Sequence, residues 1–161
     1  MKNNILILCD TRQQKDKHIT DYFDKHHIVW QRATLPNCGD YMAIKYSTTN
    51  GMMKDYSILI DTKQDLLELV GNLCNRSEHE RLRREVMHAR EIGCKEFIFL
   101  ITDNNIKKVD DIINWKNKYS KVKGETLIKI MKTFKERYGV KFMFCTKQTA
   151  GKIIYNLLTK I

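Results

Sequence analysis

Short apolar runs of strand type alternate along this chain with segments of helical periodicity. The apolar runs are NILILCD, IVWQRA, YMAIKY, YSILID, EFIFLIT and VKFMFCT. Helices are expected between and after them, at residues 18–27, 65–73, 77–92, 110–119, 125–138 and 149–158. Strands interleaved with helices in this order predict a three-layer α/β/α fold around a central mixed β-sheet. In such folds, functional sites gather where the central strands end.

The size and composition are those of a globular protein without a membrane-spanning segment. With 161 residues, the chain has the length of one domain, so we expect a single domain over residues 1–161. No apolar run approaches the roughly 18 residues that cross a bilayer, and the N-terminus does not resemble a signal peptide. The five cysteines are scattered without a CxxC pair, which argues against a disulfide framework and a zinc site. We therefore expect a cytoplasmic protein.

The chain is strongly basic. Lys and Arg number 29 against 19 Asp and Glu, and the net charge of +10 favours a polyanionic partner such as nucleic acid. Part of this charge lies in the helix expected over residues 77–92, where Ser77 and Glu80 fit a capping box. The core face of this helix is expected to hold Leu82, Val86, Ala89 and Ile92. Arg81 and Arg84 then lie on other faces, where they either contact a DNA backbone or form a solvated surface with neighbouring glutamates.

Three aspartates stand where apolar strands are expected to end or begin. Asp10 ends the first strand, Asp40 precedes YMAIKY, and Asp61 ends YSILID. Lys63 follows Asp61 by two residues, so the two side chains share one face of an extended chain. Any one of these aspartates alone is most often a turn former or a helix cap. Together they predict a carboxylate cluster that binds Mg²⁺, beside a lysine that can stabilise phosphoryl charge or position water.

These motifs together resemble those of the XPF-type nuclease domain, a family within the PD-(D/E)xK nuclease class. The resemblance rests on DTRQQ after the first strand, the Gly-Asp-aromatic step GDY, and the strand that ends in DTK before a leucine-rich helix. The motifs stand in the family's order between Ile5 and Thr102. Two residues depart from it, because Asp61 stands where the family has glutamate and Thr62 where it has arginine. The resemblance implies a restriction-endonuclease-like nuclease core.

The resemblance also implies a metal-dependent DNA endonuclease that uses Mg²⁺ or Mn²⁺ to hydrolyse phosphodiester bonds. It implies catalytic roles for Asp10, Asp40, Asp61 and Lys63, and metal-ligand roles for the three aspartates. Arg12 matches the arginine that follows the family's first acid and is expected to hold the site or a DNA phosphate. Branched, flapped or single-strand-containing DNA is the expected substrate class, and a homodimer is left open.

Two other functions stay open from the sequence. A nuclease fold with the altered motif Asp61-Thr62-Lys63 could bind DNA in a salt-dependent manner without cutting it. A structural or adaptor protein could carry the same charge merely to remain soluble. Retention of Asp40, Asp61 and Lys63 together favours the enzyme over the non-catalytic DNA-binding module.

Overall fold

Six strands form one mixed β-sheet in the computed structural model, which describes residues 5–47 and 49–160. The strands are β1 (Ile5–Asp10), β2 (Trp30–Ala33), β3 (Tyr41–Ser47), β4 (Gly51–Lys63), β5 (Glu96–Thr102) and β6 (Lys141–Cys145). The helices are α1 (Lys17–Lys25), α2 (Leu66–Cys74), α3 (Arg76–Glu91), α4 (Gly124–Tyr138) and α5 (Ala150–Leu158), with a 3₁₀ helix η1 (Val109–Asn114). The order of these elements agrees with the alternating pattern of the sequence.

The strand order in the sheet is β2-β1-β3-β4-β5-β6, and β3 runs against its neighbours. It pairs antiparallel with both β1 and β4, whereas β1 pairs parallel with β2, and β5 pairs parallel with β4 and β6. The carboxyl ends of β1 and β4 therefore lie at the same edge of the sheet as the beginning of β3. This topology brings Asp10, Asp40 and Asp61 to one end of the sheet, although they are far apart in the chain.

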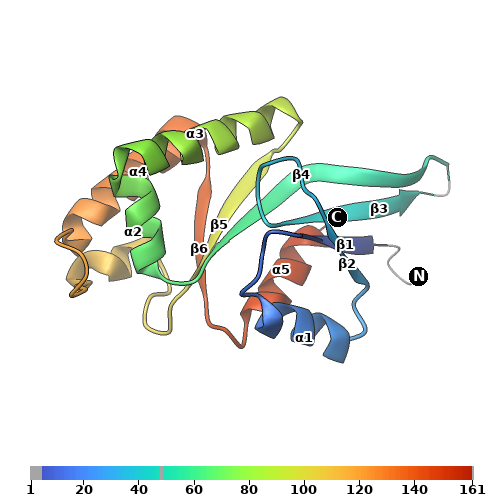
Figure 1. Ribbon diagram of the computed structural model, residues 1–161, viewed down its shortest axis with the longest axis horizontal. Coiled ribbons are helices and arrows are strands. Elements are labelled where there is room, and N and C mark those ends of the chain that lie inside the picture. The colour runs from blue at the N-terminus through green and yellow to red at the C-terminus, as the bar shows by residue number, and fades with distance from the viewer. Residues whose placement is uncertain (1–4, 48, 161) are drawn as a thin grey trace.

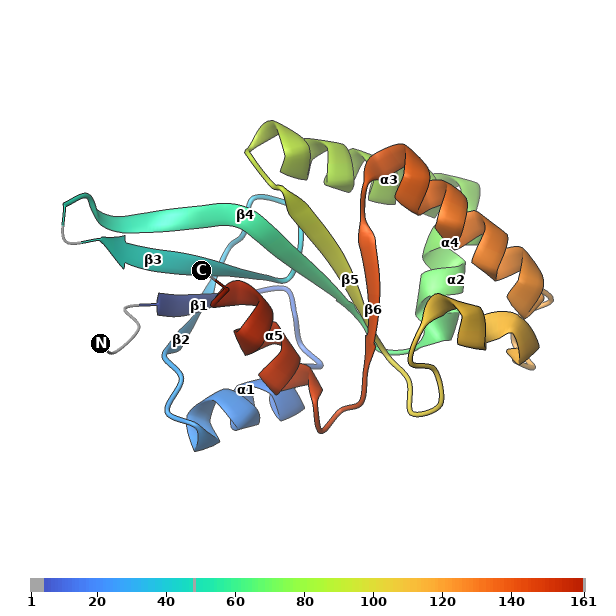
Figure 2. The ribbon, with the colours of Figure 1, turned by 180° about the vertical axis from the view of Figure 1, so that it is seen from behind.

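Helices cover both faces of the sheet, which confirms the expected three layers (Figure 1). On one face, α2, α3 and α4 pack through a core that includes Leu69, Leu82 and Met131. On the other face, α1 and α5 pack side by side through a second core that includes Phe23 and Ile154 (Figure 2). Among residues 5–47 and 49–160, none of the helices combines the length and apolar character that a membrane span requires.

β4 is much longer than the expected strand YSILID. It runs for 13 residues and forms an extended hairpin with β3 (Figure 1). Its register with β3 shifts between the pairs Tyr41–Ile60 and Ala43–Asp55, which marks an irregularity in the pairing of the two strands. The strand also continues two residues beyond Asp61, so that this acid lies within the strand and does not end it. The irregular pairing begins at Tyr41, directly after Asp40.

The capping box expected at the start of α3 is wrong. The N-cap is Asn75, whose side-chain oxygen accepts hydrogen bonds from the backbone N–H groups of Ser77 and Glu78. Glu80 instead forms an ion pair with Arg83 on the helix surface. Asn75 takes the capping position because α2 ends at the preceding residue and the chain turns directly into α3.

The helix expected over residues 110–119 is also wrong. Only η1 forms, and residues 115–123 are irregular apart from an isolated bridge between Asn117 and Ser120. The side chain of Asn117 accepts a hydrogen bond from the N–H of Tyr119, and the hydroxyl of Ser120 accepts one from Val122. Such local bonds compete with helical ones, so these polar residues hold an irregular segment between η1 and α4.

Gly124 and Gly71 form a matched pair for testing how η1 packs on α4. A Cβ on Gly124 would collide with the backbone oxygen of Ile112, whereas one on Gly71 in α2 would meet nothing within 4 Å. We expect Gly124→Ala to lower the free energy of unfolding by about 1–3 kcal/mol, because the backbone of η1 must move. Gly71→Ala should raise it by about 0.5–1 kcal/mol, because alanine favours the helix. Urea denaturation checks both signs, and a change of the same sign in both variants would contradict this packing.

Candidate active site

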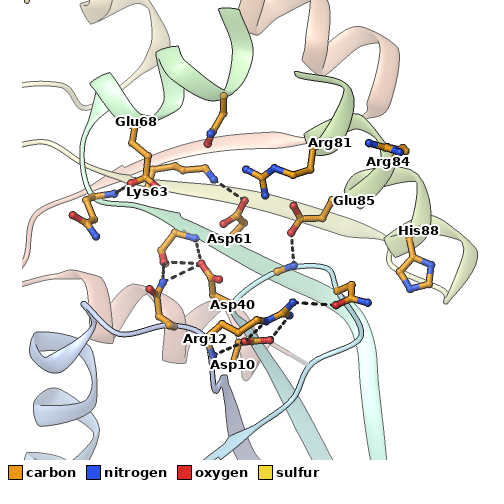
Figure 3. A pocket seen from close by; sticks show the side chains of 16 residues that line it. Asp10, Arg12, Asp40, Asp61, Lys63, Glu68, Arg81, Arg84, Glu85 and His88 are labelled. Carbon is orange, nitrogen blue, oxygen red and sulfur yellow. Dashed lines mark hydrogen bonds and ion pairs between the residues drawn. The ribbon is translucent and has the colours of Figure 1, made fainter. Parts of the chain in front are cut away.

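A pocket of about 670 Å³ opens at the strand ends, between the loops before α1 and β3 and the helices α2 and α3 (Figure 3). Every residue that the sequence predicted for catalysis or DNA binding lines it. These residues are Asp10, Arg12, Asp40, Asp61, Lys63, Arg81 and Arg84. The fold thus gathers side chains from β1, β4 and α3 and from the loop before β3 around one cavity.

Asp61 and Lys63 form a buried ion pair inside the pocket. The Asp61 carboxylate lies 3.0 Å from Lys63 Nζ, and only 8% and 7% of the two side chains are exposed. The pair follows from the alternation of side chains along β4, which puts both residues on one face. Burial alone would lower the pKa of Lys63, but attraction to Asp61 raises it above its ordinary value. Lys63 therefore stays a cation within the pocket.

Asp40 is held against β4 by hydrogen bonds to one of its oxygens. Asp40 Oδ2 accepts from the backbone N–H of Thr62 at 2.8 Å, from the Thr62 hydroxyl at 2.8 Å and from Gln13 Nε2 at 3.1 Å. Removal from water raises the pKa of Asp40 well above its ordinary value, and the adjacent Asp61 carboxyl raises it further against the opposing bonds from Thr62. The two carboxyl groups lie next to each other in the pocket (Figure 3).

Asp10 is engaged by Arg12 on both of its carboxylate oxygens. Arg12 Nε donates to Oδ1 at 2.8 Å and Arg12 Nη2 donates to Oδ2 at 2.7 Å. The backbone N–H groups of Arg12 and Leu35 also donate to this carboxylate. Although burial raises the pKa of Asp10, these hydrogen bonds outweigh it and lower the pKa below its ordinary value. This arrangement favours a role in positioning Arg12 and the loop at Leu35 over a role as a free metal ligand.

Glu85 is a pocket residue that sequence reasoning missed. It lies on α3 one turn after Arg81, and its Oε1 accepts a hydrogen bond from the N–H of Gly39 at 3.0 Å (Figure 3). Removal from water, with the charge of Asp61, raises its pKa from 4.5 to about 7. The sequence could have indicated Glu85, because this acid directly precedes the core residue Val86 and so lies at the edge of the buried face of the helix. Glu85 thus ties α3 to the residue before Asp40.

The carboxylates at the centre of the pocket fit a divalent cation of the Mg²⁺ type. Asp40 and Asp61 lie together, and each is an oxygen donor of the kind that Mg²⁺ prefers. In the part of the chain that the structure describes, no group of three or more acidic, His or Cys side chains is arranged to hold a metal ion. Mg²⁺ commonly binds through one or two carboxylates and completes its shell with water and substrate phosphate. The Asp40 and Asp61 pair meets that requirement.

Basic side chains on α3 form one rim of the pocket. Arg81, Arg84 and His88 all line it, and Figure 3 shows them along the same helix as Glu85. Arg81 is paired with Glu78 at 2.6 Å on the helix surface. The guanidinium groups of Arg81 and Arg84 therefore lie where a phosphate backbone could pass the central acids.

The ERCC4 domain model matches residues 9–157. Two solved structures share the fold, described as "XPF from Aeropyrum pernix" and "XPF from Aeropyrum pernix, complex with DNA". They match with TM-scores of 0.66 and 0.65, each at 14% sequence identity and over 95% of this chain. The chain spans 63% and 62% of the length of those two chains. At 14% identity, this likeness shows the fold of the chain. Among curated proteins, none matches the sequence.

The raised pKa of Glu85 predicts how stability depends on pH when divalent ions are removed. Between pH 4.5 and about 7 the folded chain holds this proton more tightly than the unfolded chain, so the penalty of burying the charge grows as pH rises through that window. Glu85→Gln removes the charge and can still accept the bond from Gly39. We expect this variant to be more stable than the wild type at pH 8 by on the order of 1–3 kcal/mol, and no different at pH 4.5.

Urea denaturation in EDTA at several pH values measures this difference. Glu85→Ala serves as the second variant, because it removes the bond to Gly39 as well as the charge. It should be less stable than Glu85→Gln at every pH. Parallel pH profiles for the wild type and Glu85→Gln would contradict the predicted burial of this charge.

Proposed function

The chain belongs to the ERCC4 domain family, and on that premise we propose that it is a divalent-metal-dependent DNA endonuclease. The observation that carries the proposal is that Asp40, Asp61 and Lys63 line one pocket, with Asp61 and Lys63 forming an ion pair there. Two carboxylates lie next to each other there, and a buried lysine is paired with one of them (Figure 3). Such a group suits the hydrolysis of a phosphodiester, in which negative charge develops on phosphoryl oxygens.

Asp40 and Asp61 hold the metal ion in this proposal. A bound Mg²⁺ or Mn²⁺ supplies Lewis acidity toward the scissile phosphate and lowers the pKa of water. Lys63 remains protonated beside Asp61, so its ammonium stabilises charge that develops on the phosphate or orients the attacking water. Because Lys63 is buried against the ring of Phe99, with its Nζ 5.8 Å from the ring centroid, little reorganisation is needed when charge develops.

The remaining residues of the pocket position these groups. Asp10 holds Arg12, whose Nη1 also donates to the side-chain oxygen of Asn37 at 3.0 Å. The guanidinium of Arg12 is therefore fixed at the mouth of the pocket, where it can meet a DNA phosphate. Thr62 stands where XPF-type domains have arginine, and here it holds Asp40 through its hydroxyl and its N–H. Thr62 of the altered motif thus positions Asp40, which is a metal ligand in this proposal.

The DNA approaches along the rim of α3. Arg81 and Arg84 are exposed at that rim, and the net charge of +10 gives sequence-independent affinity for the phosphate backbone. The likeness to XPF-type nucleases supports branched, flapped or single-strand-containing DNA as the substrate class. A structure with a similar fold is described as an XPF in complex with DNA, which also supports DNA as the substrate.

Two pairs of an aspartate and a lysine in the sheet allow a matched test of the site. Asp61→Asn and Lys63→Met should each reduce Mg²⁺- or Mn²⁺-dependent cleavage of labelled flap, junction and single-stranded DNA by about 100-fold or more. Asp55→Asn and Lys45→Met change the same residue types in an ion pair between β4 and β3, whose charged atoms lie 2.6 Å apart and which does not line the pocket. These control variants should cleave at the wild-type rate, and EDTA should abolish cleavage in all.

The result separates the proposed enzyme from its alternatives. Cleavage that survives Asp61→Asn or Lys63→Met would place the chemistry elsewhere in the chain. DNA binding that depends on salt, without turnover with either ion, would instead support a non-catalytic DNA-binding module on this fold. Absence of DNA binding at low salt would leave only a structural or adaptor role.

A further inference from the structure

The segment between β5 and α4 carries a dense group of lysines outside the active-site pocket. Six exposed lysines lie between residues 107 and 123, and we call them the lysine platform: Lys107, Lys108, Lys116, Lys118, Lys121 and Lys123. None of them lines the pocket. Figures 1 and 2 show the segment with η1 at the end of the molecule away from the β3–β4 hairpin.

The lysine platform rests on an anchored backbone. Ile112 of η1 is fully buried, and η1 packs against α4 so closely that Gly124 has no room for a side chain. The Asp103 carboxylate accepts hydrogen bonds from the N–H groups of Asn105 and Ile106 at 2.8 and 3.0 Å. The segment is therefore irregular in conformation but fixed in place, as loops that bind ligands commonly are.

The acids of this segment, which the structure describes in full, form no ion pair with the platform lysines. The Asp111 carboxylate accepts from the backbone N–H groups of Lys107 and Lys108, and Asp110 pairs with Lys132 of α4 at 3.3 Å. Ion pairs within residues 5–47 and 49–160 involve other lysines, and none of the six platform lysines takes part in one. Six like charges on a short segment repel each other unless a polyanion neutralises them.

An exposed aromatic ring lies among these lysines. The side chain of Tyr119 is 75% exposed, which is unusual for a large aromatic residue. Its ring is covered on one face by the Lys118 ammonium, 4.9 Å from the ring centroid. The backbone that carries the ring is fixed in a turn from Asn117 to Ser120, in which the side-chain oxygen of Asn117 accepts the N–H of Tyr119 at 2.8 Å. An aromatic ring among cations is the arrangement that binds unpaired bases and their backbone.

We propose that the lysine platform binds single-stranded DNA, with a base stacked on Tyr119 and lysines contacting the adjacent phosphates. The proposal rests on the proposed function only in taking DNA as the polyanion. Single-stranded DNA is the form that the exposed ring favours, because the bases of a duplex are already stacked on each other. The platform then holds a strand that leaves the pocket, at a surface that takes no part in cleavage.

Binding to fluorescein-labelled oligo(dT) and to a blunt duplex, measured in EDTA over a range of salt, tests the platform. Tyr119→Ala should weaken oligo(dT) binding by about 5- to 100-fold and duplex binding by less than about twofold. Tyr119→Phe keeps an aromatic ring and should bind oligo(dT) as the wild type does. The triple change of Lys116, Lys118 and Lys121 to glutamine should reduce the dependence of log affinity on log salt by about 2.

A second triple variant controls for net charge. Lys25, Lys54 and Lys95 are exposed and lie outside the platform, and changing them to glutamine removes the same number of charges. This variant should lose less oligo(dT) affinity than the platform variant. Equal losses in the two triple variants would overturn the proposal in favour of general attraction. An equal effect of Tyr119→Ala on oligo(dT) and duplex would overturn the assignment to single strands.

Cleavage assays distinguish failure of the platform from failure of the proposed enzyme. The platform variants should retain the wild-type cleavage rate at saturating DNA, because their residues lie outside the pocket. If the wild type binds oligo(dT) through the platform but cuts no DNA, the endonuclease assignment fails and the platform stands. If it cuts DNA while all platform variants bind oligo(dT) normally, the platform fails and the endonuclease stands.

Discussion

The backbone of Asp40 joins the two strands that carry the other acids of the pocket. Its N–H donates to the carbonyl of Ile60 in β4 at 2.7 Å, and its own carbonyl accepts from the N–H of Asp10 at 2.8 Å. These backbone hydrogen bonds place Asp40 between β1 and β4 without help from any side chain. Gly39 leads the chain into this position with a φ of +74°, where a Cβ would also crowd the carbonyl of Ile60. Glu85 accepts the N–H of Gly39 and so couples α3 to the same turn.

The acids around Asp40 differ in how their negative charge is compensated. Asp10 is neutralised by Arg12, and Asp61 is paired with the lysine two residues further along the strand. Asp40 and Glu85 are held by hydrogen bonds, and burial beside Asp61 raises the pKa of each. When Asp40, Asp61 and Glu85 are all ionised, Lys63 alone does not offset their charge, which is the physical reason that a divalent cation suits the centre of the pocket.

The positive charge of the chain is distributed unevenly over its surface. On α3, Arg81 and Arg83 are paired with glutamates of the same helix, so part of their charge is satisfied locally. Between β5 and α4, the acids bind backbone N–H groups or a lysine of α4, and the platform lysines stay unpaired. The net charge of the chain does not distinguish these two regions. The structure separates a rim that borders the central acids from a surface that presents cations around an exposed ring.

The sequence by itself determined the strands and most helices, because alternation with a period of two or of 3.6 is a property of a single element. For the same reason it placed Asp61 beside Lys63, and it put Asp10 at the end of β1 and Asp40 directly before β3. Only the tertiary structure decided that Asp10 is engaged by Arg12 and that Glu85 reaches the turn before Asp40. It also decided that residues 115–123 form no helix. Those features depend on sheet order, on helix packing and on competing local hydrogen bonds, none of which leaves a periodic signal in the chain.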